Sequence, residues 1–111
     1  MNTSVADLLS VTATSVEVKK HTLSFDLSDG RTIVAPIAWF PRLNHGTPAE
    51  RHNWRLIGDG QGAHWPDLDE DISVEGLLLG RPSRESQESL RRWLQQRKTS
   101  KISASSSRRK R

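Results

Sequence analysis

The chain has 111 residues, of which 33% are hydrophobic, and a net charge of +4 at neutral pH. This length fits one small domain with a compact core, and it excludes a large multidomain enzyme. The absence of cysteine excludes disulfides and thiolate metal sites, and no apolar run approaches the ~20 residues of a membrane-spanning helix. The first residues lack the basic and apolar regions of a signal peptide, so we expect a cytoplasmic protein.

The first clear pattern lies between residues 14 and 37. Apolar and polar residues alternate around Val16 and again from Leu23 to Leu27, which is typical of half-buried strands. Asp29-Gly30 then separates two such runs, and this pair favours a tight hairpin turn with positive φ. The sequence therefore predicts an antiparallel meander of three strands at residues 14–20, 22–28 and 31–37.

The middle of the chain predicts shorter elements. Residues 39–43 indicate a short helical turn that brings two aromatic rings onto the sheet. Thr47, Pro48 and Glu50 have the order of an N-cap, a first-turn proline and a capping-box acid, so a short helix is expected there. Three further elements follow, namely a strand at 54–57, a turn at 59–62 and a short strand at 63–65.

An acidic stretch follows Pro66 and contains Asp67, Asp69, Glu70 and Asp71. We interpret residues 72–80 as a short helix that Asp71 caps at its start and Gly80 at its end. The alternation of Ile72, Val74 and Leu78 fits a strand as well, and this alternative stays open.

The last ordered element is predicted as a helix at residues 83–98. Its acids lie near the start and its arginines near the end, which matches the helix dipole, and Leu90, Trp93 and Leu94 form a narrow apolar seam. Residues 97–111 carry seven basic side chains and no acid, whereas residues 1–96 sum to −3. We expect residues 99–111 to be disordered in isolation. The helix either folds back onto its own sheet, which we favour, or reaches a partner.

Separated blocks of the chain resemble one bacterial family. The blocks are Leu23 to Arg31, then Trp39-Phe40-Pro41-Arg42-Leu43, then Arg51 and Trp54, and finally His64 to Val74 with Gly76-Leu77-Leu78. In this order, over residues 12–82, they resemble the domain-of-unknown-function family number 2442. The resemblance implies a small α/β fold with a curved antiparallel sheet. It also implies a second small protein encoded beside it, as in a toxin–antitoxin pair, and it supplies no catalytic residues. Some members of the family are fused to a helix-turn-helix, for which this chain has no room.

No catalytic, cofactor-binding or metal-binding residues emerge from the motifs. The acidic stretch begins like an EF-hand loop, but Ile72 and Leu78 stand where that loop needs glycine and glutamate. His64 has no recognisable nucleophile near it, so a hydrogen-bonded structural role is expected. Trp65 and Trp39 are expected in the core, because a domain with few apolar residues needs its large rings inside.

We interpret the chain as an α+β domain at residues 1–82, a helix at 83–98 and a basic tail at 99–111. The sheet is predicted as the three-strand meander plus one or two further strands. The leading hypothesis is a non-catalytic binding or regulatory module, antitoxin-like, with a small protein as its partner. The candidate partner-binding residues are Leu90, Arg91, Trp93, Leu94 and Arg97. The alternative is a nucleic-acid-binding accessory protein that uses Lys98, Lys101, Arg108, Arg109, Lys110 and Arg111.

Overall fold

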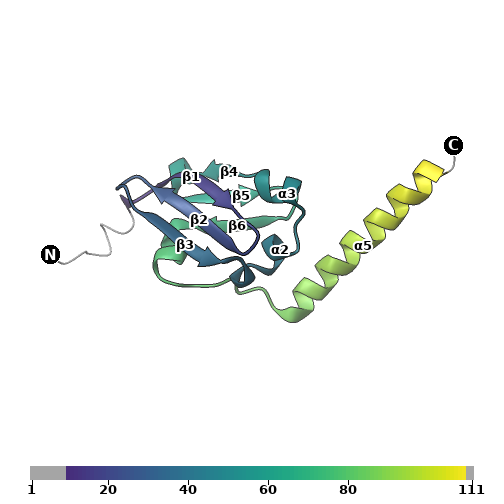
Figure 1. Ribbon diagram of the computed structural model, residues 1–111. Helices are drawn as coiled ribbons and strands as arrows, with labels where there is room; N and C mark the ends of the chain where they lie inside the picture. Colours follow the sequence, from purple (N-terminus) through teal and green to yellow (C-terminus); the bar gives the residue numbers. More distant parts are fainter. Residues whose placement is uncertain (1–9, 110–111) are drawn as a thin grey trace.

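The computed structural model describes residues 10–109, with only the backbone for residues 100–109. Within these residues six strands form two antiparallel three-strand sheets, accompanied by short helices and followed by one long helix (Figure 1). The predicted α+β class with a C-terminal helix is therefore confirmed. No helix in this part of the chain has the length and apolar character needed to cross a membrane.

The first sheet is the predicted meander. Strands β1 (Ala13–Val18), β2 (Thr22–Leu27) and β3 (Thr32–Pro36) pair in this order, with Phe25 of the central strand opposite Val16 and Ile33. The hairpin loop differs from the predicted tight turn, because only Gly30 has a positive φ, of 91°. The amide of Gly30 donates to the carbonyl of Leu27, and this wider loop uses a single left-handed glycine.

The second sheet contains the further strands expected from the sequence and one that replaces part of a predicted helix. Strands β4 (Arg55–Ile57), β5 (Gly62–Trp65) and β6 (Glu70–Ser73) pair in this order. Residues 70–73 therefore extend along β5, and the prediction that Asp71 caps a helix is wrong. Within the predicted helix 72–80, the alternative of a strand holds only for Ile72 and Ser73, because pairing with β5 satisfies the hydrogen-bonding groups of their backbone.

Helix α4 (Val74–Leu78) is shorter than predicted. Its N-cap is Ser73, whose hydroxyl accepts a hydrogen bond from the amide of Gly76 at 2.9 Å. At its other end Gly80 has φ of 69°, and the amides of Gly80 and Arg81 donate to the carbonyls of Leu77 and Gly76. This is the Schellman arrangement, and it confirms that Gly80 ends the helix.

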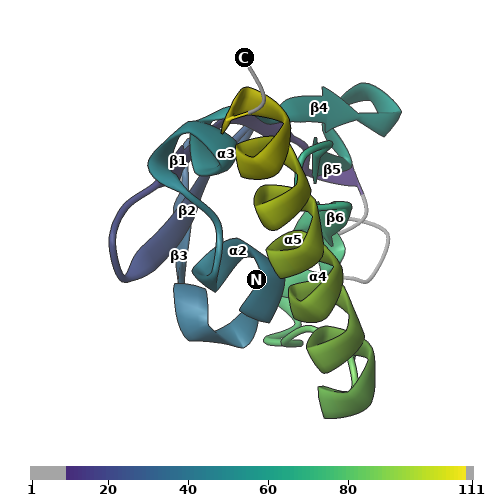
Figure 2. The same ribbon diagram turned by 90° about the vertical axis from the view of Figure 1, so that its right-hand side faces the viewer.

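One hydrophobic core lies between the two sheets, which face each other in Figure 2. Strands of both sheets supply it, and its largest fully buried side chain is that of Trp65, which is 0% exposed. The indole Nε1 of Trp65 donates to the carbonyl of Arg51 at 2.9 Å. The core position predicted for Trp65 is confirmed, whereas Trp39 is half-buried and packs against the same cluster.

Short helical segments gather at one end of the two sheets. They are η1 (Ile37–Trp39), α2 (Pro41–Asn44) and α3 (Pro48–His52), while η2 (Gly58–Gly60) joins β4 to β5. Thr47 and Glu50 form the predicted capping box at the start of α3. The helical turn expected at residues 39–43 is also confirmed.

Helix α5 (Gln87–Arg109) passes across the end of the domain that carries α2 and α3 (Figure 2), and its C-terminal part extends away from the sheets (Figure 1). It begins and ends later than the predicted range of 83–98. The residues before it are held in an extended segment, and Ser86 accepts a hydrogen bond from the amide of Ser89 at 3.0 Å, as an N-cap does. Beyond residue 98, where the sequence predicted a tail that is disordered in isolation, the described backbone continues as helix to Arg109, since no glycine or proline interrupts it.

Candidate interaction site on the C-terminal helix

The segment leading into α5 is anchored by an ion pair between Arg42 of α2 and Glu85. Nη2 of Arg42 lies 2.6 Å from Oε2 of Glu85, and Nε lies 2.9 Å from both carboxylate oxygens. Both side chains are mostly removed from solvent. The hydrogen bond from Arg42 lowers the pKa of Glu85 below its ordinary value, which means that the carboxylate is held in its charged form.

A second anchor lies three turns further along α5. Arg97 makes a two-point contact with Glu50 of α3, with Nη1 to Oε2 at 3.0 Å and Nη2 to Oε1 at 2.8 Å. The same carboxylate accepts the amide of Thr47 at 2.9 Å in the capping box. The hydrogen bonds from Arg97 lower the pKa of Glu50 to about 2, against the desolvation that raises it.

The ring of Trp93 lies between the two anchors. The guanidinium carbon of Arg42 is 5.1 Å from the ring centroid, and that of Arg97 is 4.7 Å from it. These are cation–π distances, and the ring also packs against the hydrophobic core cluster. Helix α5 is thus held on its own domain by two ion pairs and one aromatic ring, as the favoured alternative predicted.

This docking divides the five residues predicted to bind a partner. Trp93 and Arg97 face the domain and are used in the intramolecular contact, so they are not free for a partner while the helix is docked. Leu90 and Leu94 are half-buried, and Arg91 is exposed. The apolar seam is therefore a docking face, and only Arg91 of the five is displayed on the outer side of the helix.

The structure describes only some of the residues predicted to bind nucleic acid. Lys98 is exposed on α5, and the backbone of Lys101, Arg108 and Arg109 continues the same helix. Lys110 and Arg111 lie outside the described residues.

The acidic stretch serves several separate contacts. Asp67 accepts a hydrogen bond from Asn53 at 2.9 Å, and Asp69 lies 3.6 Å from Arg42. Asp71 Oδ1 lies 2.5 Å from Nδ1 of His64, its partner across β5 and β6. Among the described residues no three His, Cys, Asp or Glu side chains are grouped as a metal site would require.

Sequence reasoning missed Arg42, Glu50 and Glu85 as the residues that position α5. Arg42 and Glu85 are 43 residues apart, and Glu50 and Arg97 are 47 apart. Ion pairs at such separations leave no local pattern, because periodicity reports only neighbours along one element. The sequence did single out Glu50, but only as the acid of the capping box at the start of α3.

Comparisons with known proteins give one family and two similar folds. The model of the family described as protein of unknown function (DUF2442) matches residues 13–83. The crystal structure of a protein of unknown function from Rhodospirillum rubrum is similar, with 24% identity and a TM-score of 0.61 over 68% of this chain and 94% of that one.

The solution structure of an uncharacterised protein from Chromobacterium violaceum is also similar. It has 26% identity and a TM-score of 0.57, covering 65% of this chain and 68% of that one. None of the curated proteins matches the chain. Since the family model covers more than half of the residues, including both sheets and α4, the chain belongs to the DUF2442 family.

Proposed function

We propose that the protein is a non-catalytic binding module, antitoxin-like, which holds a small protein partner on the outer face of α5. One observation carries this proposal. The helix is fixed to the domain by Trp93 and Arg97 on one face, which leaves Arg91 and Lys98, seven residues apart, exposed on another. Residues spaced by seven lie on the same side of an α-helix, so the fixed helix displays a basic face.

The chemistry of this face favours a partner with an acidic surface. Arg91, Arg92 and Lys98 are exposed and make no ion pair with any residue that the structure describes. Complementary charge speeds association and selects the orientation of docking. The module would act in the cytoplasm, together with the small protein that the family's gene arrangement implies.

Co-expression with the protein encoded by the adjacent gene tests the proposal. We expect the two chains to elute together, and the Arg91→Glu/Lys98→Glu variant to lose about tenfold or more in affinity, because two attractions become repulsions. The matched control is Lys19→Glu/Lys20→Glu, which makes the same change of charge at the exposed turn after β1. Equal binding by both variants, or no binding by the wild type, contradicts the proposal.

A second candidate function is nucleic-acid binding, which the unbroken course of α5 to Arg109 favours. The major groove of DNA admits an α-helix, and seven phosphate contacts from residues 97–111 imply a log–log salt slope of about −6. No aromatic residue follows Trp93, so such binding is expected to ignore base sequence.

Fluorescence anisotropy with a labelled duplex tests the second candidate. Removing residues 100–111 keeps the Arg97–Glu50 anchor and deletes five basic residues. The slope is then expected to become shallower by about 4 if these residues contact phosphates. An unchanged slope assigns no phosphate contact to them.

A further inference from the structure

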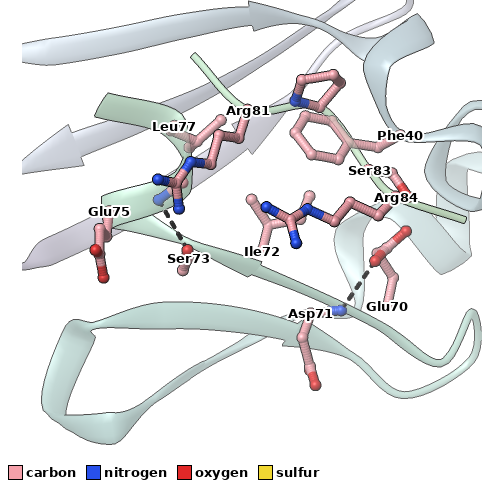
Figure 3. Close-up of a pocket in the computed structure, with 12 residues that line it drawn as sticks. Phe40, Glu70, Asp71, Ile72, Ser73, Glu75, Leu77, Arg81, Ser83 and Arg84 are labelled. Atoms are coloured by element: carbon pink, nitrogen blue, oxygen red, sulfur yellow. Dashed lines mark hydrogen bonds between the residues drawn. The ribbon is translucent and has the colours of Figure 1, made fainter. Parts of the chain in front are cut away.

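A hollow of about 420 Å³ lies on the side of the domain formed by β6, α4 and the segment that connects α4 to α5 (Figure 3). Buried apolar side chains form part of its lining, and the connecting segment supplies polar ones. The residues that matter for the argument are Phe40, Glu70, Ile72, Leu77, Arg81 and Arg84.

The two arginines enter this hollow from a backbone that is held in place. The amide of Arg81 donates to the carbonyl of Gly76 at 2.8 Å, and the amide of Ser83 donates to the carbonyl of Trp39 at 2.9 Å. Glu85, directly after Arg84, is fixed by its ion pair with Arg42. The backbone that carries the two arginines, three residues apart, is therefore held in place, which lowers the entropy lost when both side chains contact one ligand.

Neither guanidinium has a partner of its own. Among the residues that the structure describes, the side chains of Arg81 and Arg84 make no hydrogen bond or ion pair. Both extend across the hollow in Figure 3, and Asp71 points away from them toward His64. The domain pairs Arg42 and Arg97 with carboxylates but leaves these two arginines available to an external anion.

We propose that this hollow is a binding site for an oxyanion, a carboxylate or phosphate group carried by a small ligand, with Arg81 and Arg84 as its two recognition residues. Guanidinium groups bind such oxyanions through paired N–H donors. The apolar lining from Phe40, Ile72 and Leu77 suits a ligand whose anionic group is attached to an apolar body.

The affinity of this site for an anion is expected to depend on pH through Glu70. Burial is the main reason why the pKa of Glu70 is raised to about 7. The negative charges of Glu85 and Asp71 also raise this pKa, whereas the hydrogen bond from the amide of Asp71 and the charge of Arg42 lower it. Figure 3 shows Arg84 and Glu70 toward one end of the lining and Glu75 toward the other. Below about pH 7 the protonated Glu70 donates a hydrogen bond to an anion, whereas above this pH its negative charge repels one.

NMR titration of the full chain, labelled with ¹⁵N, tests the site at constant ionic strength. The two probes are inorganic phosphate and N-acetylphenylalanine, with the uncharged amide of N-acetylphenylalanine as the control ligand. We expect saturable shifts of the side-chain Nε–H signals of Arg81 and Arg84 with at least one anionic probe. The probe that saturates identifies phosphate or carboxylate as the preferred group.

Two variants make the test specific. Arg81→Gln/Arg84→Gln is expected to weaken binding about tenfold or more, while Lys19→Gln/Lys20→Gln, an exposed basic pair elsewhere, leaves it unchanged. Carboxylate binding should be about fivefold or more tighter at pH 6 than at pH 8, and Glu70→Gln should remove this difference. Absence of saturation by both probes, or equal affinity in the arginine double variant, overturns the proposal.

Discussion

Glu50 and Arg97 join helix α3 to helix α5 through one carboxylate with two roles. Its oxygens accept the amide of Thr47 at the start of α3 and the guanidinium of Arg97 on α5, at 2.9 Å and 2.8 Å for Oε1. A residue that caps the start of one helix also positions another. The placement of α5 therefore depends on the integrity of α3.

The Arg97→Ala substitution is expected to loosen α5 and leave the two sheets intact. The side chains of Arg97 and Glu50 are 17% and 22% exposed, so loss of their ion pair should cost about 1 kcal/mol. Hydrogen exchange should speed up in residues 87–99 and stay unchanged in β2. The control is Arg91→Ala, which removes an exposed arginine from the same helix. It should leave the exchange rates of residues 87–99 and of β2 unchanged. Equal exchange in both variants would show that Arg97 does not hold the helix.

Acid is expected to release α5 at a pH set by Glu50. The folded pKa of about 2 lies below the ordinary 4.5, so the folded state favours the charged form. The stabilisation is present above about pH 4.5 and is lost as the pH falls toward 2, where Glu50 takes up a proton. The indole N–H signal of Trp93 should move through this range and not above it. In Arg97→Ala the part of this shift caused by Glu50 should be lost, while the part caused by Glu85 through Arg42, which lies beside the same ring, should remain.

Trp65→Ala is expected to cost about 3–5 kcal/mol, because it empties the largest fully buried site and leaves the carbonyl of Arg51 without its donor. This is a large share of the stability of a small domain. Urea unfolding measures it. Val34→Thr, at a β3 side chain that is 58% exposed, should shift the midpoint little. A wild-type midpoint for Trp65→Ala is incompatible with the core described above.

Gly30 and Gly60 offer a matched pair of alanine substitutions, since both have φ of 91°. At Gly30 an added Cβ meets nothing within 4 Å, so only the backbone strain of about 1–2 kcal/mol applies. At Gly60 the Cβ would lie 2.8 Å from the carbonyl oxygen of Ala13, a backbone atom of the other sheet. We expect Gly60→Ala to cost about 2 kcal/mol more than Gly30→Ala in thermal or urea unfolding. Equal losses of unfolding free energy would mean that the backbone at Ala13 shifts away from the added Cβ at little energetic cost.

Glu70→Gln is expected to stabilise the protein at alkaline pH. Because the folded pKa of about 7 lies above the ordinary 4.5, the folded state binds the proton more tightly, and wild-type stability falls as the pH rises from 4.5 to 7. The neutral glutamine avoids this loss, which is on the order of 1–2 kcal/mol after allowance for partial exposure. At pH 5 the two proteins should unfold at similar urea concentrations. Glu75→Gln, exposed on α4, serves as the control.

Local sequence patterns were enough to predict the first sheet, the capping box of α3 and the position of Trp65. Each of these depends on neighbours in the chain or on the size of one ring: alternation at period two, a threonine three residues before a glutamate, and a large apolar surface in a domain with few others. The blocks from Leu23 to Leu78 also sufficed to identify the family.

The course of residues 70–73 and the attachment of α5 depend instead on contacts between distant parts of the chain. Glu70 to Ser73 carries signals for both helix and strand, and pairing with β5 settles the choice because it satisfies the backbone along the whole segment. The partners of Arg42 and Arg97 lie more than forty residues away, and the choice among carboxylates depends on where the folded chain places them. Local pattern identifies an element where its signal is unambiguous, whereas strand pairing and the packing of distant side chains decide the ambiguous segments and where each element lies.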